Sequence, residues 1–149
     1  MPPTPLVPTN LHDATPSSSP FSVMCIDDNE LLVDALERRL DLEPGFTGFH
    51  RVLDFALSVE GAVQHHPSIV LLDIDLPGDV DALRILADLV ARVPASRVIV
   101  FTGYPSGELL EVTLSLGAWG FVSKGVSAER LIGAIRRVST GEAVIELEE

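Results

Sequence analysis

Polar side chains stand directly after four short apolar runs in this sequence. Each run reads as a β-strand, so the polar group that follows it is predicted to lie at that strand's carboxyl end. In an open parallel sheet these ends meet at one edge, and ligands bind there. The residues that this pattern brings to one edge are Asp27, Asp28, Asp73, Thr102 and Lys124.

Three carboxylates, a hydroxyl and a lysine at one edge suit a particular chemistry. Crowded carboxylates repel one another unless a cation joins them, and oxygen ligands favour a hard divalent ion such as Mg²⁺. A divalent cation combined with a lysine is how proteins stabilise a transferring phosphoryl group. Asp73 is the candidate nucleophile, because it follows the predicted central strand and a carboxylate can form an acyl phosphate.

The elements that must position these residues alternate between strand and helix. Asn29 or Asp28, Ser106 and Ser127 are predicted helix N-caps, and Pro or Gly residues separate the elements. The alternation predicts one α/β domain, a (βα)5 doubly wound parallel five-stranded sheet of order 2-1-3-4-5, which is the flavodoxin-like arrangement. The predicted strands are Phe21–Ile26, Phe46–Val52, Ile69–Leu72, Arg97–Phe101 and Trp119–Ser123. The predicted helices cover about residues 29–43, 56–65, 83–93, 106–116 and 127–141.

Length and charge restrict the class of protein further. At 149 residues and 46% hydrophobic content, the chain can form one well-buried core. Its formal net charge of -12 repels polyanions, so we expect no direct binding to nucleic acid or to an anionic membrane. The single cysteine, Cys25, excludes an internal disulfide, and no apolar run is long enough to span a bilayer, so we expect a cytoplasmic protein.

The two ends of the chain differ in composition from the middle. Residues 1–20 are rich in Pro, Ser and Thr and have no apolar period, so they are predicted to form a disordered arm. Residues 21–141 form the predicted domain. Residues 142–149 alternate only weakly and are acidic, and we interpret them as a C-terminal tail or a truncated linker.

The residues around the strand ends form longer motifs. They are the pair Asp27-Asp28, the turn Leu71-Leu72-Asp73-Ile74-Asp75-Leu76-Pro77-Gly78, the run Phe101-Thr102-Gly103, and Gly117-Ala118-Trp119-Gly120-Phe121-Val122-Ser123-Lys124. In this order and spacing they resemble the receiver domain of bacterial two-component response regulators, the CheY-like superfamily. The resemblance covers roughly Phe21 to Gly141, and the ending Ala134–Gly141 is similar to that of LuxR-type regulators.

The resemblance implies a role for each site residue. Asp73 would accept a phosphoryl group from a histidine of a sensor kinase or phosphotransfer protein, or from a small acyl phosphate. Asp27, Asp28 and Asp73 would hold Mg²⁺ together with the backbone carbonyl of Asp75, and Lys124 would bind the phosphoryl oxygens. The implied catalysis is limited to self-catalysed phosphoryl transfer to Asp73 and autodephosphorylation.

The resemblance also implies a switch and its partners. Thr102 would move its hydroxyl onto the phosphoryl group, and Phe121 would turn into the vacated space. The surface formed by the fourth helix, the fifth strand and the fifth helix would then contact a downstream effector protein or a C-terminal output domain, or form a homodimer. Charged residues that could pair between subunits there are Arg130, Arg136, Arg137, Glu108 and Glu111.

Several residues depart from the common receiver pattern. Gly125 follows Lys124 where many receivers have proline, which predicts a looser loop without the usual cis peptide. The turn after Asp73 is one residue longer than usual, and Asp75 adds a carboxylate beside the site.

Two other functions are compatible with parts of the pattern. Haloacid-dehalogenase-like Mg²⁺ phosphatases share the Leu71–Asp75 motif, but their acidic pair follows the nucleophile, whereas Asp27 and Asp28 precede it here. A receiver-like interaction module that never carries phosphate is the second alternative. The sequence does not separate a stand-alone regulator from the receiver of a longer protein.

Overall fold

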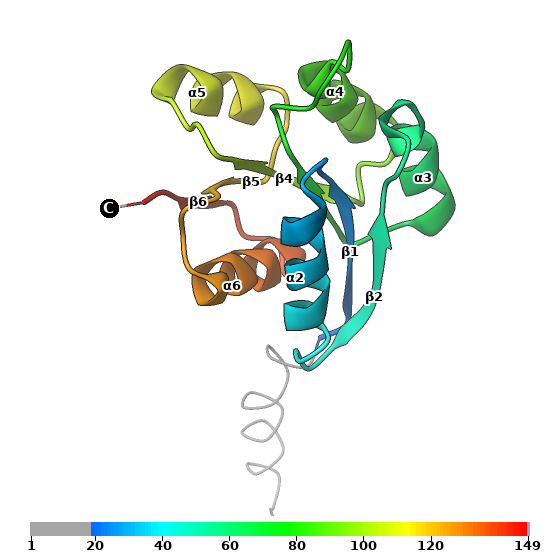
Figure 1. Cartoon of the computed structure of the whole chain (residues 1–149), viewed down its shortest axis with the longest axis vertical. Coiled ribbons are helices and arrows are strands. Elements are labelled where there is room, and N and C mark those ends of the chain that lie inside the picture. The colour runs from blue at the N-terminus through cyan, green and yellow to red at the C-terminus, as the bar shows by residue number, and fades with distance from the viewer. Residues whose placement is uncertain (1–18, 149) are drawn as a thin grey trace, which may run out of the picture.

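One parallel β-sheet of six strands forms the centre of the protein, as Figure 1 shows. The computed structural model describes residues 19–148. The strand order is β2-β1-β3-β4-β5-β6, and every neighbouring pair is parallel. The predicted order 2-1-3-4-5 is therefore confirmed. The strands are β1 (Phe21–Ile26), β2 (Phe46–Arg51), β3 (Ile69–Leu72), β4 (Arg97–Thr102), β5 (Gly120–Ser123) and β6 (Val144–Glu146).

Helices connect successive strands, and side chains cap them at the predicted places. Asn29, Ser106 and Ser127 each accept a hydrogen bond from a backbone N–H in the first turn of the helix that follows. Asp81 caps another helix in the same way. The helices are α2 (Glu30–Leu40), α3 (Ser58–His65), α4 (Ala82–Arg92), α5 (Gly107–Ser115) and α6 (Ala128–Ser139), with a short 3-10 helix η1 (Phe55–Leu57) before α3.

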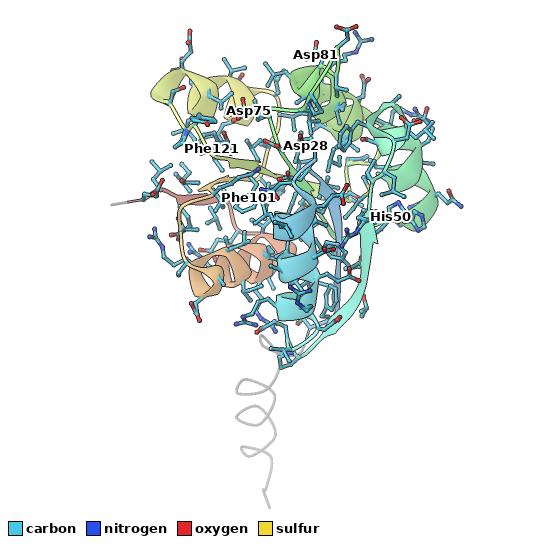
Figure 2. All side chains as sticks on the ribbon, viewed as in Figure 1. Asp28, His50, Asp75, Asp81, Phe101 and Phe121 are labelled. Carbon is cyan, nitrogen blue, oxygen red and sulfur yellow. The ribbon has the colours of Figure 1, made fainter. Side chains whose placement is uncertain are left out.

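The helices form a layer on each face of the sheet. Helices α2 and α6 cover one face, and α3, α4 and α5 cover the other (Figure 1). Phe101 belongs to the core under α2 and α6, whereas Phe121 belongs to the core under the other three helices, so the two rings lie on opposite sides of the sheet (Figure 2). Apolar burial on both faces explains why the central strands are continuous aliphatic runs.

The strand order opens a crevice at the carboxyl end of the sheet. Strand β2 lies on one side of β1 and β3 lies on the other, so the chain reverses its winding direction beside β1. The Asp73 N–H donates to the carbonyl of Ile26 at 2.9 Å, and the Lys124 N–H donates to the carbonyl of Thr102 at 2.8 Å. Backbone pairing therefore holds the ends of β1, β3, β4 and β5 in register.

The sixth strand is a difference from the sequence analysis, which assigned residues 142–149 to a tail or linker. Val144–Glu146 pair in parallel with Gly120–Val122 of β5. The Val144 side chain is buried in the core under α6. A three-residue strand among glutamates has little local signal, because its stability comes from this pairing and burial.

Other expectations concern the ends of the chain. The predicted disordered arm lies outside the described residues, except for its last two positions, 19 and 20. Among residues 19–148, no helix has the length and apolar character needed to cross a membrane.

We expect Gly117→Ala to lower the free energy of unfolding by about 1–3 kcal/mol. Gly117 precedes β5 with a φ of 106°, and an added Cβ would lie 2.8 Å from Cγ1 of Val90. Gly133→Ala in α6 is the matched control, because nothing lies within 4 Å of its added Cβ. That variant should be neutral or more stable by up to about 1 kcal/mol. Urea denaturation measures both, and equal effects at the two positions would contradict the prediction.

Candidate functional site

Asp73 lies at the centre of the candidate site. It follows β3, which pairs with β1 on one side and β4 on the other. Its side chain is 4% exposed, and its Oδ1 accepts a hydrogen bond from the Asp75 N–H at 3.0 Å. One carboxylate oxygen is thus fixed by the following turn, and Oδ2 faces the neighbouring charges.

Asp27 and Asp28 come from the end of β1, as the sequence predicted. Oδ1 of Asp27 accepts from the Asn29 N–H at 2.9 Å, and the residue is 7% exposed. Asp28 is exposed (Figure 2). Each of Asp27, Asp28 and Asp73 offers a carboxylate oxygen, and these oxygens lie within 4.8 Å of one another. This cluster could hold a metal ion.

Lys124 reaches the cluster from the end of β5. Its Nζ lies 2.7 Å from Oδ2 of Asp27 and 3.4 Å from Oδ2 of Asp73. Oδ2 of Asp27 is buried and faces the Lys124 ammonium as an ion pair. Three carboxylates exceed the charge of one lysine, and carboxylate oxygens are the ligands that a hard cation prefers, so the donor set fits the metal site that the sequence predicted.

Burial and charge shift the pKa values of two site residues. Burial raises the pKa of Asp73 above its ordinary value; the Asp75 N–H opposes this shift and the charge of Asp27 adds to it. Burial lowers the pKa of Lys124, but its hydrogen bond to Asp27 and the charges of Asp27 and Asp73 outweigh this, so the net shift is upward. Lys124 therefore stays charged at neutral pH, and three carboxylates with one lysine leave the site with a negative charge that attracts a cation.

Thr102 lies at the end of β4 and is fully buried. Its hydroxyl lies 3.4 Å from Oδ2 of Asp75 and accepts a hydrogen bond from the Tyr104 N–H at 3.1 Å. The Asp75 carboxylate, which sequence reasoning placed beside the site, thus contacts the Thr102 hydroxyl directly. Asp75 and Asp28 lie at the same end of the molecule (Figure 2).

Phe121 is the residue predicted to act as an aromatic switch. It is the second residue of β5, which lies between β4 and β6, and it is fully buried among the residues of α4 and α5. Its ring is therefore packed inward.

Sequence reasoning brought the charged residues together correctly but missed two features of the surroundings. The first is the set of backbone N–H groups of Asn29, Asp75 and Tyr104, which hold the site side chains. Each donor is two residues after its acceptor, and that spacing is the signal of an Asx or Ser/Thr turn. The second is Glu148, whose Oε1 accepts from the Ser123 hydroxyl at 3.0 Å beside Lys124. No local pattern indicates this contact.

The arginines of α6 also have partners that sequence reasoning did not find. Arg130 and Arg137 pair with the glutamates of residues 142–146, within the same chain. Arg136 pairs with Glu43 at 2.8 Å. The three arginines considered for a homodimer therefore already have intramolecular partners.

The fold and the site together define a class of protein. The chain matches the response regulator receiver domain family over residues 23–136, and it belongs to that family. The predicted resemblance is thereby confirmed. The comparisons with known proteins give no support to the phosphatase or to the phosphate-independent module.

Individual relatives and solved structures agree with this family. The chain is 30% identical over 125 residues to the transcriptional regulatory protein DegU of Brevibacillus brevis, covering 84% of this chain and 52% of that protein. It is 26% identical over 129 residues to the nitrate/nitrite response regulator protein NarL of Escherichia coli (strain K12), covering 87% and 59%. The chain thus spans about half the length of the curated relatives it matches.

Solved structures show the same fold. A LuxR-family two-component response regulator from Aurantimonas sp. SI85-9A1 aligns with a TM-score of 0.78 at 22% identity, covering 85% of this chain and 89% of that one. A DNA-binding response regulator of the LuxR family from Staphylococcus aureus aligns with a TM-score of 0.72 at 23% identity, covering 80% and 98%.

We expect Asp28→Asn to stabilise the protein in the absence of divalent cations by about 0.5–2 kcal/mol, because it removes one of three repelling carboxylates. The same change should abolish most of the stabilisation by Mg²⁺, which for a single site amounts to about 2.7 kcal/mol at a concentration of 100 Kd. Thermal unfolding with and without Mg²⁺ measures both effects.

Asp79→Asn is the matched control, because Asp79 is an exposed residue of the same charge outside the cluster. It should leave the response to Mg²⁺ unchanged. An Asp28→Asn variant that Mg²⁺ stabilises as strongly as the wild type would contradict the assignment of the site.

Proposed function

We propose that Asp73 accepts a phosphoryl group and that the chain acts as a phosphorylation-dependent switch. The observation that carries this proposal is the environment of its carboxylate. One oxygen is held by the Asp75 N–H, and the other lies 3.4 Å from the ammonium of Lys124, at a negatively charged rim. Attack by Asp73 on phosphorus forms an acyl phosphate, and the bond from phosphorus to the donor's imidazole nitrogen or acyl oxygen breaks, leaving its electron pair on the donor.

We propose Mg²⁺ as the cation of this site, held by Asp27, Asp28 and Asp73 with the backbone carbonyl of Asp75. When bound, Mg²⁺ would neutralise the carboxylates and the charge that develops on the phosphoryl oxygens. Lys124 then leaves Asp27 for the phosphoryl oxygens. It is a short movement, because Nζ already lies within 3.4 Å of both carboxylates.

The switch begins at Thr102. Its hydroxyl leaves the Asp75 carboxylate and donates to the phosphoryl group, which is the stronger acceptor because it carries more charge. Phe121 of β5 lies in register with Val100 of β4, two residues before Thr102, so a displacement of Thr102 would change the packing of that ring. We propose that the surface formed by α5, β5 and α6 transmits this change.

The proposed partners follow from the phosphoryl chemistry. A sensor histidine kinase or a histidine phosphotransfer protein supplies the phosphoryl group, and a downstream effector protein or a C-terminal output domain receives the signal. The relatives DegU and NarL are described as regulatory proteins, and the alignments cover 52% and 59% of their lengths. The charge of -12 argues against binding of nucleic acid by the chain itself.

We propose the cytoplasm as the location of the protein. Its single cysteine, Cys25, is a free thiol buried in the core, and burial raises its pKa to about 12. A thiol of this kind is unreactive and suits a reducing compartment.

The first test is the intact mass of the protein after incubation with acetyl phosphate and Mg²⁺. We expect one phosphate-sized gain in the wild type, no gain without Mg²⁺ and none in Asp73→Asn. The Thr102→Ala variant should still gain the mass of one phosphate, because the Thr102 hydroxyl is proposed to act in the switch and Asp73 is the acceptor. Labelling of Asp73→Asn equal to that of the wild type, or multiple turnover of a phosphomonoester, would overturn the proposal.

A further inference from the structure

The segment 142–148 covers the outer edge of β5, and we call it the C-terminal strap. Figure 1 shows β6 at this edge, between α5 and α6. Its Val144 N–H donates to the Trp119 carbonyl at 3.1 Å, and Val144 is 3% exposed. Phe121 pairs in register with Ile145. The strap therefore extends the sheet on the strand that contains Phe121 and that Lys124 follows directly.

Two arginines of α6 hold the strap in place through hydrogen bonds and ion pairs. Arg130 donates from Nε to Glu146 at 2.8 Å and from a terminal nitrogen to the carbonyl of Leu147 at 2.9 Å. Arg137 contacts Glu142 at 3.0 Å and Glu146 at 3.5 Å. These charged hydrogen bonds give the strap a defined register, although exposed pairs of this kind add little stability individually.

The far end of the strap contacts the turn that contains Lys124. The Glu148 carboxylate accepts from the Ser123 hydroxyl at 3.0 Å, and a Cβ added to Gly125 would overlap that carboxylate. Ser123 also accepts from the Gly125 N–H at 3.2 Å. Ser123 thus contacts Glu148 directly, and the Glu148 carboxylate occupies the space that a side chain at position 125 would need.

The strap also lines one side of a hollow next to Phe121, the proposed switch residue. A hollow of about 280 Å³ lies between the start of α5 and the strap, and Leu110, Phe121, Leu147 and Glu148 are among its lining residues. Any partner that binds α5, β5 and α6 together meets the strap first. The strap therefore covers the β5 edge within the proposed output face.

We propose that the C-terminal strap is an autoinhibitory cover of the face formed by α5, β5 and α6, and that phosphorylation of Asp73 releases it. This inference rests on the proposed function. A phosphoryl group raises the charge at Asp73 from -1 to about -1.5 to -2 and draws Lys124 toward it. The turn of Ser123–Gly125 moves with Lys124 and disturbs the contact between Ser123 and Glu148. By linkage, release of the strap in turn favours phosphorylation.

The test is amide hydrogen exchange of the strap in the full chain, followed by mass spectrometry with and without Mg²⁺ and beryllofluoride, a mimic of the phosphoryl group. We expect the strap amides to be protected in the free protein and to exchange roughly tenfold faster with beryllofluoride. Fluorine NMR reports separately whether beryllofluoride is bound. Protection that stays unchanged while beryllofluoride is bound would overturn the coupling.

Variants test the strap without any phosphoryl mimic. Gly125→Ala displaces Glu148, and Arg130→Ala removes the anchor to Glu146 and Leu147, so each should raise exchange of the strap roughly tenfold. Gly133→Ala, on the same helix as Arg130 and with open space around it, should not. Unprotected strap amides in the wild type would contradict the inference that residues 142–148 are held against β5. Failure to bind beryllofluoride would instead overturn the proposed function and the coupling, while the variants still decide whether the strap exists.

Discussion

The sharing of one ammonium group by two buried carboxylates is the interaction on which the site depends. Asp27 and Asp73 are each less than one-tenth exposed, and Lys124 contacts both. Separately buried charges of this kind would be strongly unfavourable, so each residue needs the other two. The arrangement is still incomplete, because two carboxylates and the adjacent Asp28 exceed the charge of a single lysine. This excess negative charge makes the carboxyl edge of the sheet a site for a cation.

The parallel sheet makes this crowding achievable. Asp27, Asp73 and Lys124 each follow a strand whose carboxyl end is held by backbone pairing to its neighbour, so their positions depend on rigid elements rather than on loops. Aliphatic burial under two layers of helices supplies the stability that opposes the charge repulsion. Residues in the loops, such as Asp28 and Asp75, are more exposed and complete the site from outside.

The C-terminal strap connects a departure from the family pattern to the structure. Where many receivers have proline after the site lysine, this chain has Gly125, and the Lys124–Gly125 peptide is trans. The glycine leaves room for the Glu148 carboxylate, so a residue nine positions beyond the end of α6 contacts the turn that contains Lys124. At Gly125, a departure from the family pattern therefore coincides with a contact that belongs to this chain's own C-terminal segment.

The sequence by itself determined the core of the fold and the charged part of the site. Strands such as Ile69–Leu72 are recognisable because burial on both faces selects continuous aliphatic runs, and a polar residue directly after each run identifies its carboxyl end. Tertiary structure decided the rest. Val144–Glu146 became a strand only because β5 had a free edge and α6 presented arginines to its glutamates. The division of Lys124 between Asp27 and Asp73 likewise depends on distances across the four neighbouring strands β1, β3, β4 and β5, and local sequence does not encode such distances.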